Sequence, residues 1–102
     1  MLGLILLLMF IIFITRLNNK ENLTRNPNED WYDWYYNTYL QSKHWKKKRI
    51  RALCNAGFYC QECGNRTSLQ VHHLSYKNLG NEPDYDLKVL CRNCHEQNHN
   101  IQ

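Results

Sequence analysis

The stretch that decides the fold is "LQVHHLSYKNLGNEPDYDLKVLCRNCHEQNH", residues 69–99. It places two adjacent histidines before a cysteine pair, and two further histidines follow that pair. A second closely spaced cysteine pair lies upstream. Two such pairs suit a tetrahedral Zn²⁺ site better than disulfides across two-residue loops, so we read a reducing compartment. We therefore predict a structural zinc ion on four thiolates: Cys60, Cys63, Cys91 and Cys94.

The small size of the chain leads us to expect that metal binding stabilises the fold. A chain of 102 residues has room for one small domain, which rarely buries enough apolar surface to be comfortably stable. Much of the 43% hydrophobic content lies in the first fourteen residues, so the remainder is poor in aliphatic side chains. Metal ligation would supply the missing stability. The fifth cysteine, Cys54, follows a helical apolar pattern and is expected to be a small packing residue.

The N-terminal segment, residues 1–16, is an apolar run, "MLGLILLLMFIIFIT", ended by an arginine. It is shorter than the ~20 residues that cross a bilayer upright. We expect a membrane anchor or uncleaved signal-anchor; a cleaved signal, a mistaken start and an aggregation-prone tail are the alternatives. If it inserts, the basic residues after it place the rest of the chain in the cytoplasm. Residues 17–29 are predicted to be a solvated linker and residues 30–102 the folded domain.

Two helices are predicted ahead of the cysteines. From Asp30 onward, aromatic residues recur at helical spacing, and we expect them to pack against the zinc module rather than to stack on bases. Ser42 is a suitable N-cap for a second helix from Lys43 to Ala56, and Gly57 supplies a left-handed stop.

This second helix is strongly basic, in a chain whose formal net charge is +4. A row of cations on its outer face can neutralise phosphates, so we predict a nucleic acid partner, with DNA the expected one. A solvated helix face is the alternative. The candidate nucleic-acid-binding residues are Lys43, Lys46, Lys47, Lys48, Arg49 and Arg51.

The histidines are left over once the cysteines hold zinc. Residues 69–73 alternate as in a short strand, whereas His95 and His99 are spaced to share one face of a helix. A strand presenting His72 and a helix presenting His95 and His99 would hold a catalytic Mg²⁺ or another divalent cation with open positions. His73 would then deprotonate the attacking water. The alternative is that these histidines only pack the zinc module.

Together these motifs resemble the HNH endonuclease family. The resemblance runs through "YLQSKHWKKKRIRAL", then "GFYCQECG", then residues 69–99, and the order CxxC, paired histidines, LCxxCHxxxH carries it. It implies an α+β fold: a small zinc-stabilised ββα-metal domain, here preceded by a basic helix and an N-terminal hydrophobic helix. It also implies metal-dependent hydrolysis of phosphodiester bonds in DNA.

The resemblance implies a role for each histidine. His73 resembles the general base, His72 takes the place of the ligand before it, and His95 resembles the final metal ligand. His99 falls where some members have another ligand. Asp86 stands where the family has its middle Asn, and its carboxylate could accept a hydrogen bond from His73 and orient the ring.

Two other functions compete with the endonuclease. A nucleic-acid-binding zinc module would have lost catalysis through the change at Asp86. A membrane-tethered adaptor would use the zinc fold to contact another protein and would show no salt-sensitive binding to DNA.

Overall fold

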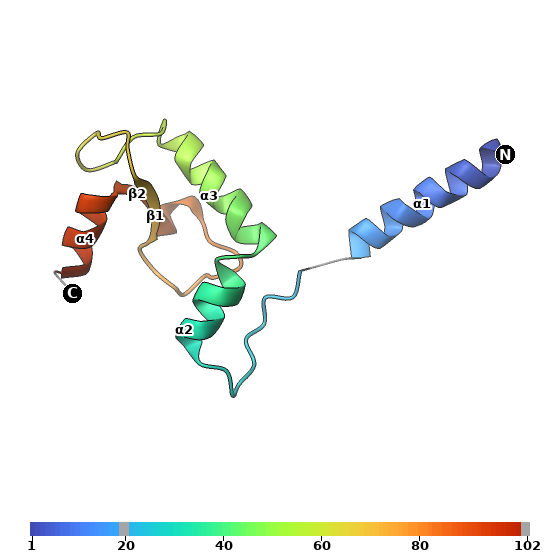
Figure 1. Cartoon of the computed structure of the whole chain (residues 1–102), viewed down its shortest axis with the longest axis horizontal. Helices are drawn as coiled ribbons and strands as arrows, with labels where there is room; N and C mark the ends of the chain where they lie inside the picture. Colours follow the sequence, from blue (N-terminus) through green and yellow to red (C-terminus); the bar gives the residue numbers. More distant parts are fainter. Residues whose placement is uncertain (19–20, 101–102) are drawn as a thin grey trace.

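The computed structural model describes residues 1–18 and 21–100, and its architecture is a small α+β fold of helices around a two-stranded sheet (Figure 1). The predicted fold class is confirmed at this level. In chain order the elements are α1 (Leu2–Asn18), α2 (Trp31–Trp34), a π-helical turn (Tyr35–Tyr39), α3 (Lys43–Asn55), β1 (Leu69–His73), a 3-10 turn (Asp84–Asp86), β2 (Leu87–Cys91) and α4 (Arg92–Asn100).

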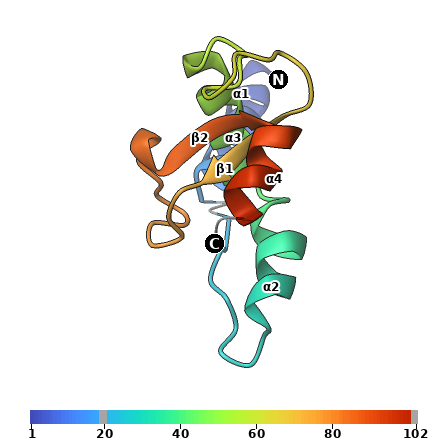
Figure 2. The same ribbon diagram turned by 90° about the vertical axis from the view of Figure 1, so that its left-hand side faces the viewer.

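The ββα unit lies at the centre of the domain. β1 pairs antiparallel with β2, with Leu69 opposite Cys91 and His73 opposite Leu87. Helix α4 begins directly after β2, and both α3 and α4 contact the two strands. In Figure 1 the two helices lie on opposite sides of the sheet, and Figure 2 shows α4 packed across the strands. Successive residues of β1 therefore face different helices.

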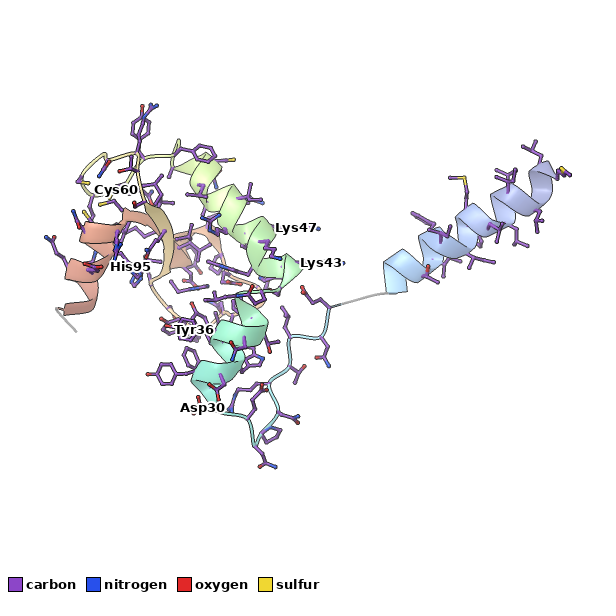
Figure 3. All side chains as sticks on the ribbon, viewed as in Figure 1. Asp30, Tyr36, Lys43, Lys47, Cys60 and His95 are labelled. Atoms are coloured by element: carbon purple, nitrogen blue, oxygen red, sulfur yellow. The ribbon has the colours of Figure 1, made fainter. Side chains whose placement is uncertain are left out.

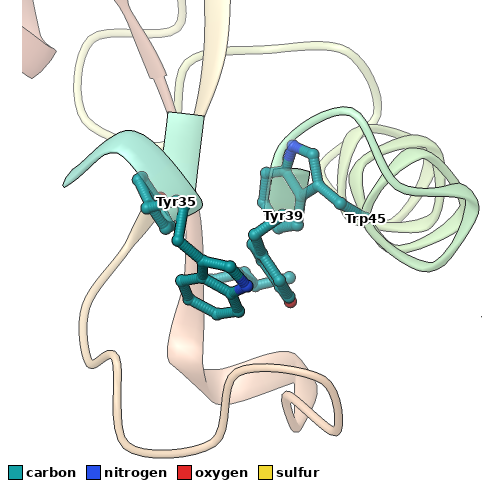
Figure 4. Close-up of a cluster of buried hydrophobic side chains, with 5 residues drawn as sticks. Tyr35, Tyr39 and Trp45 are labelled. Atoms are coloured by element: carbon teal, nitrogen blue, oxygen red, sulfur yellow. The ribbon is translucent and has the colours of Figure 1, made fainter. Parts of the chain in front are cut away.

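The core consists of two small clusters instead of one large one. The first is aromatic and includes Tyr35, Tyr39 and Trp45, which Figure 4 shows close together. The second surrounds the cysteines and includes Leu90, which is fully buried. The aromatic side chains do pack, as predicted. They form a cluster of their own, however, and the zinc module has a separate core.

Helix α3 begins at the predicted residue and ends at Asn55, one residue before the predicted end. The Ser42 hydroxyl accepts a hydrogen bond from the Trp45 N–H at 3.0 Å, and Gly57 has a φ of +66°, which suits a helix stop. The carboxylate of Glu21 accepts the N–H groups of residues 43 and 44, and Leu23 packs against the aromatic cluster. The segment predicted to be a solvated linker therefore contacts the domain at two points.

Helix α1 stands apart from the rest of the structure in Figure 1, and its apolar side chains are exposed from Leu2 to Ile14. It is 17 residues long. Within residues 1–18 and 21–100, no helix is both long enough and apolar enough to span a membrane.

Removing the cap of α3 tests this account of the helix start. Ser42 is buried, and its hydroxyl pairs a backbone N–H that has no other acceptor in the first turn. We expect Ser42→Ala to lower the free energy of unfolding by about 1 kcal/mol. Urea unfolding with zinc present measures this change. Thr38→Ala removes an exposed hydroxyl and serves as the control; equal losses in the two variants would contradict the capping role.

Candidate active site and metal centres

The four paired cysteines converge on one point. Their sulfur atoms all lie within 4.8 Å of one another, and Cys63 and Cys91 are 3.6 Å apart between Sγ atoms. A tetrahedron of thiolates at 2.3 Å from zinc has S···S edges of about 3.8 Å. The donor set and its spacing therefore fit a structural metal ion, and the predicted grouping of the cysteines is confirmed.

A tight loop at residues 60–65 presents the first cysteine pair. Gly64 adopts a φ of +78° and donates its N–H to the Cys60 carbonyl, and the Cys60 N–H donates to Asn65. Gln61 exchanges hydrogen bonds with Val89 through its backbone N–H and its side-chain oxygen. These bonds attach the loop to β2, which carries the third cysteine at its end.

The surroundings of the four thiols favour the thiolate form at Cys60. Burial would raise the pKa of Cys60, but backbone N–H groups of Cys63 and Cys91 point at its sulfur and lower that pKa to about 6. The Cys91 sulfur and burial raise the pKa of Cys94. A bound cation would replace the remaining thiol protons. Cys54 lies outside this cluster and is exposed, so its predicted packing role is wrong.

His72 and His95 lie side by side, as predicted for metal ligands. Their ring centroids are 4.9 Å apart and the rings are nearly perpendicular, at 77°. His72 comes from the face of β1 that meets α4, and it is buried; His95 lies in the first turn of α4 and is half-buried. This arrangement is compatible with two ring nitrogens binding one cation. The side chain of His99, the third predicted ligand, lies outside the described residues.

His73 points to the other face of β1, toward α3. Its ring stacks on Trp45 with centroids 4.4 Å apart, and its side chain is only 1% exposed. The Tyr35 hydroxyl lies 2.8 Å from Nδ1, and a carboxylate oxygen of Glu82 lies 2.9 Å from Nε2. Because a carboxylate only accepts, Nε2 carries the proton and Nδ1 accepts from Tyr35.

Glu82 is the centre of a buried polar network. It is 1% exposed, and besides His73 its carboxylate binds the Tyr39 hydroxyl and, at 2.7 Å, the His44 Nε2. The Lys48 ammonium donates to its backbone carbonyl. Burial alone would raise the pKa of Glu82, but the hydrogen bonds from His73, Tyr39 and His44 hold it well below the usual range.

The carboxylate that contacts His73 belongs to Glu82, whereas the sequence predicted Asp86 in this position. The structure gives Asp86 another partner: its side chain accepts from Asn78 at 2.9 Å, and its carbonyl accepts the Leu74 N–H. Asp86 therefore holds the loop after β1, and Glu82 contacts His73. The sequence around Glu82 did not predict this contact. Its only local signal is a single acidic residue between turn-forming neighbours, which is too weak to assign a partner.

A pocket of about 270 Å³ runs along β1 and connects these groups. Both β1 histidines contribute to its lining, and so does His95. Arg49 of α3 brings a guanidinium to the same cavity, and Tyr36 and Tyr76 bring aromatic rings. Two candidate metal ligands, an arginine guanidinium and two aromatic rings thus line the same pocket.

The predicted basic residues of α3 lie on more than one side of the helix: Lys47, Lys48 and Arg51 line one shallow pocket, and Arg49 lines another. Figure 3 shows Lys43 and Lys47 projecting from α3 on the side away from His95. Lys48 is committed to the Glu82 carbonyl, and Arg51 forms a 3.4 Å ion pair with an exposed aspartate. Among the six, only Arg49 lines the pocket of about 270 Å³.

The buried carboxylate makes stability depend on pH. The folded-state pKa of Glu82 lies below its ordinary value of 4.5, so its stabilisation is present above about pH 4.5 and is lost as pH falls further. We expect Glu82→Gln to cost roughly 3–5 kcal/mol of unfolding free energy at about pH 7, and less as the pH falls below the ordinary pKa of 4.5. Urea unfolding of both chains, compared at pH values where both keep their metal and unfold cooperatively, measures this difference.

An exposed carboxylate provides the control. Glu96→Gln removes the partner of Arg92 at a surface where both side chains are more than half exposed. Its effect should stay within a few tenths of a kcal/mol. A pH-independent gap between wild type and Glu82→Gln would contradict the role of the buried charge.

Comparison with known proteins gives one match. The family model described as "HNH endonuclease" matches residues 60–101. This segment contains both cysteine pairs, β1, β2 and α4. The match confirms the resemblance seen in the sequence. No curated protein and no solved structure compared with the chain matches it. An HNH domain indicates a function linked to nucleic acids. Residues 60–101 are thus similar to an HNH endonuclease domain, and the structure groups their four cysteines closely enough for a metal ion and places His72 beside His95.

Proposed function

We propose that this protein is a metal-dependent endonuclease that hydrolyses phosphodiester bonds in DNA. The observation that supports this proposal best is the pairing of His72 with His95 in a pocket that also contains Arg49. The HNH match over the same histidines makes phosphodiester chemistry the natural use of such a pocket.

His72 and His95 would hold the catalytic cation, and His99 is the proposed third ligand. Mg²⁺ or a similar divalent cation supplies stabilisation of the charge that develops on the scissile phosphate and the leaving oxygen. Arg49 lines the same pocket and would donate to a non-bridging phosphate oxygen. The protein thus orients the phosphate from two elements, the β1–α4 junction and α3.

His73 is the proposed general base, and Glu82 sets its tautomer. Since Glu82 accepts from Nε2–H, Nδ1 is the nitrogen that can take a proton. The Tyr35 hydroxyl donates to Nδ1, and Tyr35 also lines the pocket. Burial, followed by the nearby Tyr76 and Tyr36 hydroxyls, raises the pKa of Tyr35, so this group stays protonated. The proton of the attacking water would pass through the Tyr35 hydroxyl to His73.

Zinc is the proposed ion at the four cysteines. Four thiolates fill a tetrahedral zinc site and leave no open position, which is typical of a structural site. Such a site needs reduced cysteines, and this requirement supports the cytoplasm as the proposed compartment.

One observation favours a second function, a nucleic-acid-binding module without catalysis. Both ring nitrogens of His73 have partners inside the protein, and its side chain is 1% exposed. If the Tyr35 hydroxyl does not relay a proton, His73 has no ring nitrogen open to a water molecule in the pocket. Both functions predict binding to DNA, but only the endonuclease predicts its cleavage.

A plasmid-nicking assay separates them. Supercoiled plasmid is incubated with the full chain and Mg²⁺, Mn²⁺ or Ni²⁺ in turn. We expect nicking, and we expect His73→Ala to lower its rate by about 10²–10⁴-fold, because a general base contributes that much. His95→Ala should also abolish it. Gln97→Ala, an exposed neighbour on α4, is the control and should nick at the wild-type rate. Salt-sensitive binding to DNA with no nicking in any metal would contradict the endonuclease and support the nucleic-acid-binding module.

The zinc proposal has its own matched pair of variants. We expect a single zinc ion per chain by elemental analysis. Cys91→Ser removes a buried ligand and should release the zinc and abolish cooperative unfolding, because small zinc domains depend on the metal to fold. Cys54→Ser changes the exposed cysteine and should keep both. Full zinc content in Cys91→Ser would rule out the four-thiolate site.

A further inference from the structure

We propose that Tyr36 and Tyr76 form an aromatic platform that stacks on unpaired bases, so that the site takes single-stranded or locally unpaired DNA. This inference rests on the proposed function, because it names the substrate class of the same pocket. It rests on the exposure of these two rings and on their position in the same pocket as the candidate metal ligands and Arg49.

The two tyrosines are exposed yet held in place. Tyr36 is 56% exposed and Tyr76 is 46% exposed. Both pack edge-on against the buried Tyr35 ring, with centroids 5.2 Å and 5.4 Å away, and Tyr76 also meets Trp31 edge-on at 5.1 Å. Rings fixed by neighbouring rings lose little conformational entropy when a ligand stacks on them. They are therefore suited to binding rather than to packing alone.

The platform lies beside the candidate metal ligands. Tyr36 and Tyr76 line the same pocket of about 270 Å³ as His72, His95 and Arg49. A nucleotide has a flat apolar base joined through its sugar to a phosphate, and this pocket offers aromatic surface next to a guanidinium and a cation site. Figure 3 shows Tyr36 and His95 on the side of the domain away from Lys43 and Lys47.

The chemistry of the pocket favours an unpaired strand. In a duplex only the edges of the bases are open in the grooves, since their faces are stacked on each other. A tyrosine ring can stack on a base only after that base has left the helix. Exposed tyrosines would also suit a protein partner, but a pocket that contains Arg49 and two histidines in a chain of net charge +4 favours an anionic one.

Binding measured without cleavage tests the platform. The full chain is titrated, with no added divalent cation, into a labelled oligothymidylate and into a blunt duplex of equal length, and fluorescence anisotropy gives both affinities. We expect the single strand to bind more tightly. Tyr36→Ala should weaken single-strand binding by roughly 5- to 150-fold and leave the duplex nearly unchanged. Tyr36→Phe keeps the ring and should retain the wild-type affinity.

Two controls separate stacking from charge. Tyr85→Ala removes a tyrosine that is 78% exposed and does not line the pocket, and it should change neither affinity. Tyr36→Ala should leave the salt dependence of binding unchanged, whereas Arg49→Ala should lower the slope of log K against log salt by about 0.7. Equal effects of Tyr36→Ala and Tyr85→Ala, or no effect of Tyr36→Ala, would overturn the platform.

These outcomes are independent of those of the nicking assay. Single-strand binding that depends on the Tyr36 ring, without nicking in any metal, supports the platform and removes the endonuclease. Nicking that requires His73, with single-strand binding unaffected by Tyr36→Ala, supports the endonuclease and overturns the platform.

Discussion

The buried carboxylate of Glu82 is the interaction on which the arrangement of this small domain depends. An anion removed from water is costly unless its oxygens are fully hydrogen-bonded. Here the donors come from separate parts of the chain: the turn after α2 supplies Tyr39, α3 supplies His44, and β1 supplies His73. Satisfying one charge therefore fixes three elements relative to one another, in a domain whose aromatic core is too small to do so alone.

The cysteine cluster connects separate elements on the other face of the sheet. It joins the loop after α3 to the end of β2 and the start of α4, and it has its own core around Leu90. β1 lies between the two centres, so the alternation of its side chains separates its adjacent histidines. His72 meets His95 on the side of α4, and His73 enters the Glu82 network on the side of α3. Their different chemical environments follow from this geometry.

The candidate site extends beyond the segment that matches the HNH model. Residues 60–101 contain the histidines and the cysteines, but the pocket is completed by Arg49 from α3 and Tyr36 from the π-helical turn. His73, the proposed base, likewise takes its Nδ1 partner from Tyr35, ahead of the matched segment. The part of the chain before residue 60 thus supplies Arg49 and Tyr36 to the pocket and Tyr35 to His73.

What the sequence by itself determined is what local spacing controls. The two CxxC pairs predicted the thiolate cluster, the alternation of residues 69–73 predicted β1, and Ser42 and Gly57 predicted the ends of α3 to within one residue. Only the tertiary structure decided the long-range partners. It put Glu82 and not Asp86 on His73, left Cys54 exposed, brought Glu21 to the start of α3 and turned Lys43 and Lys47 away from His95. The reason is physical: a hydrogen bond across nine or more residues depends on where a loop returns, and side-chain spacing along the chain carries no record of that path.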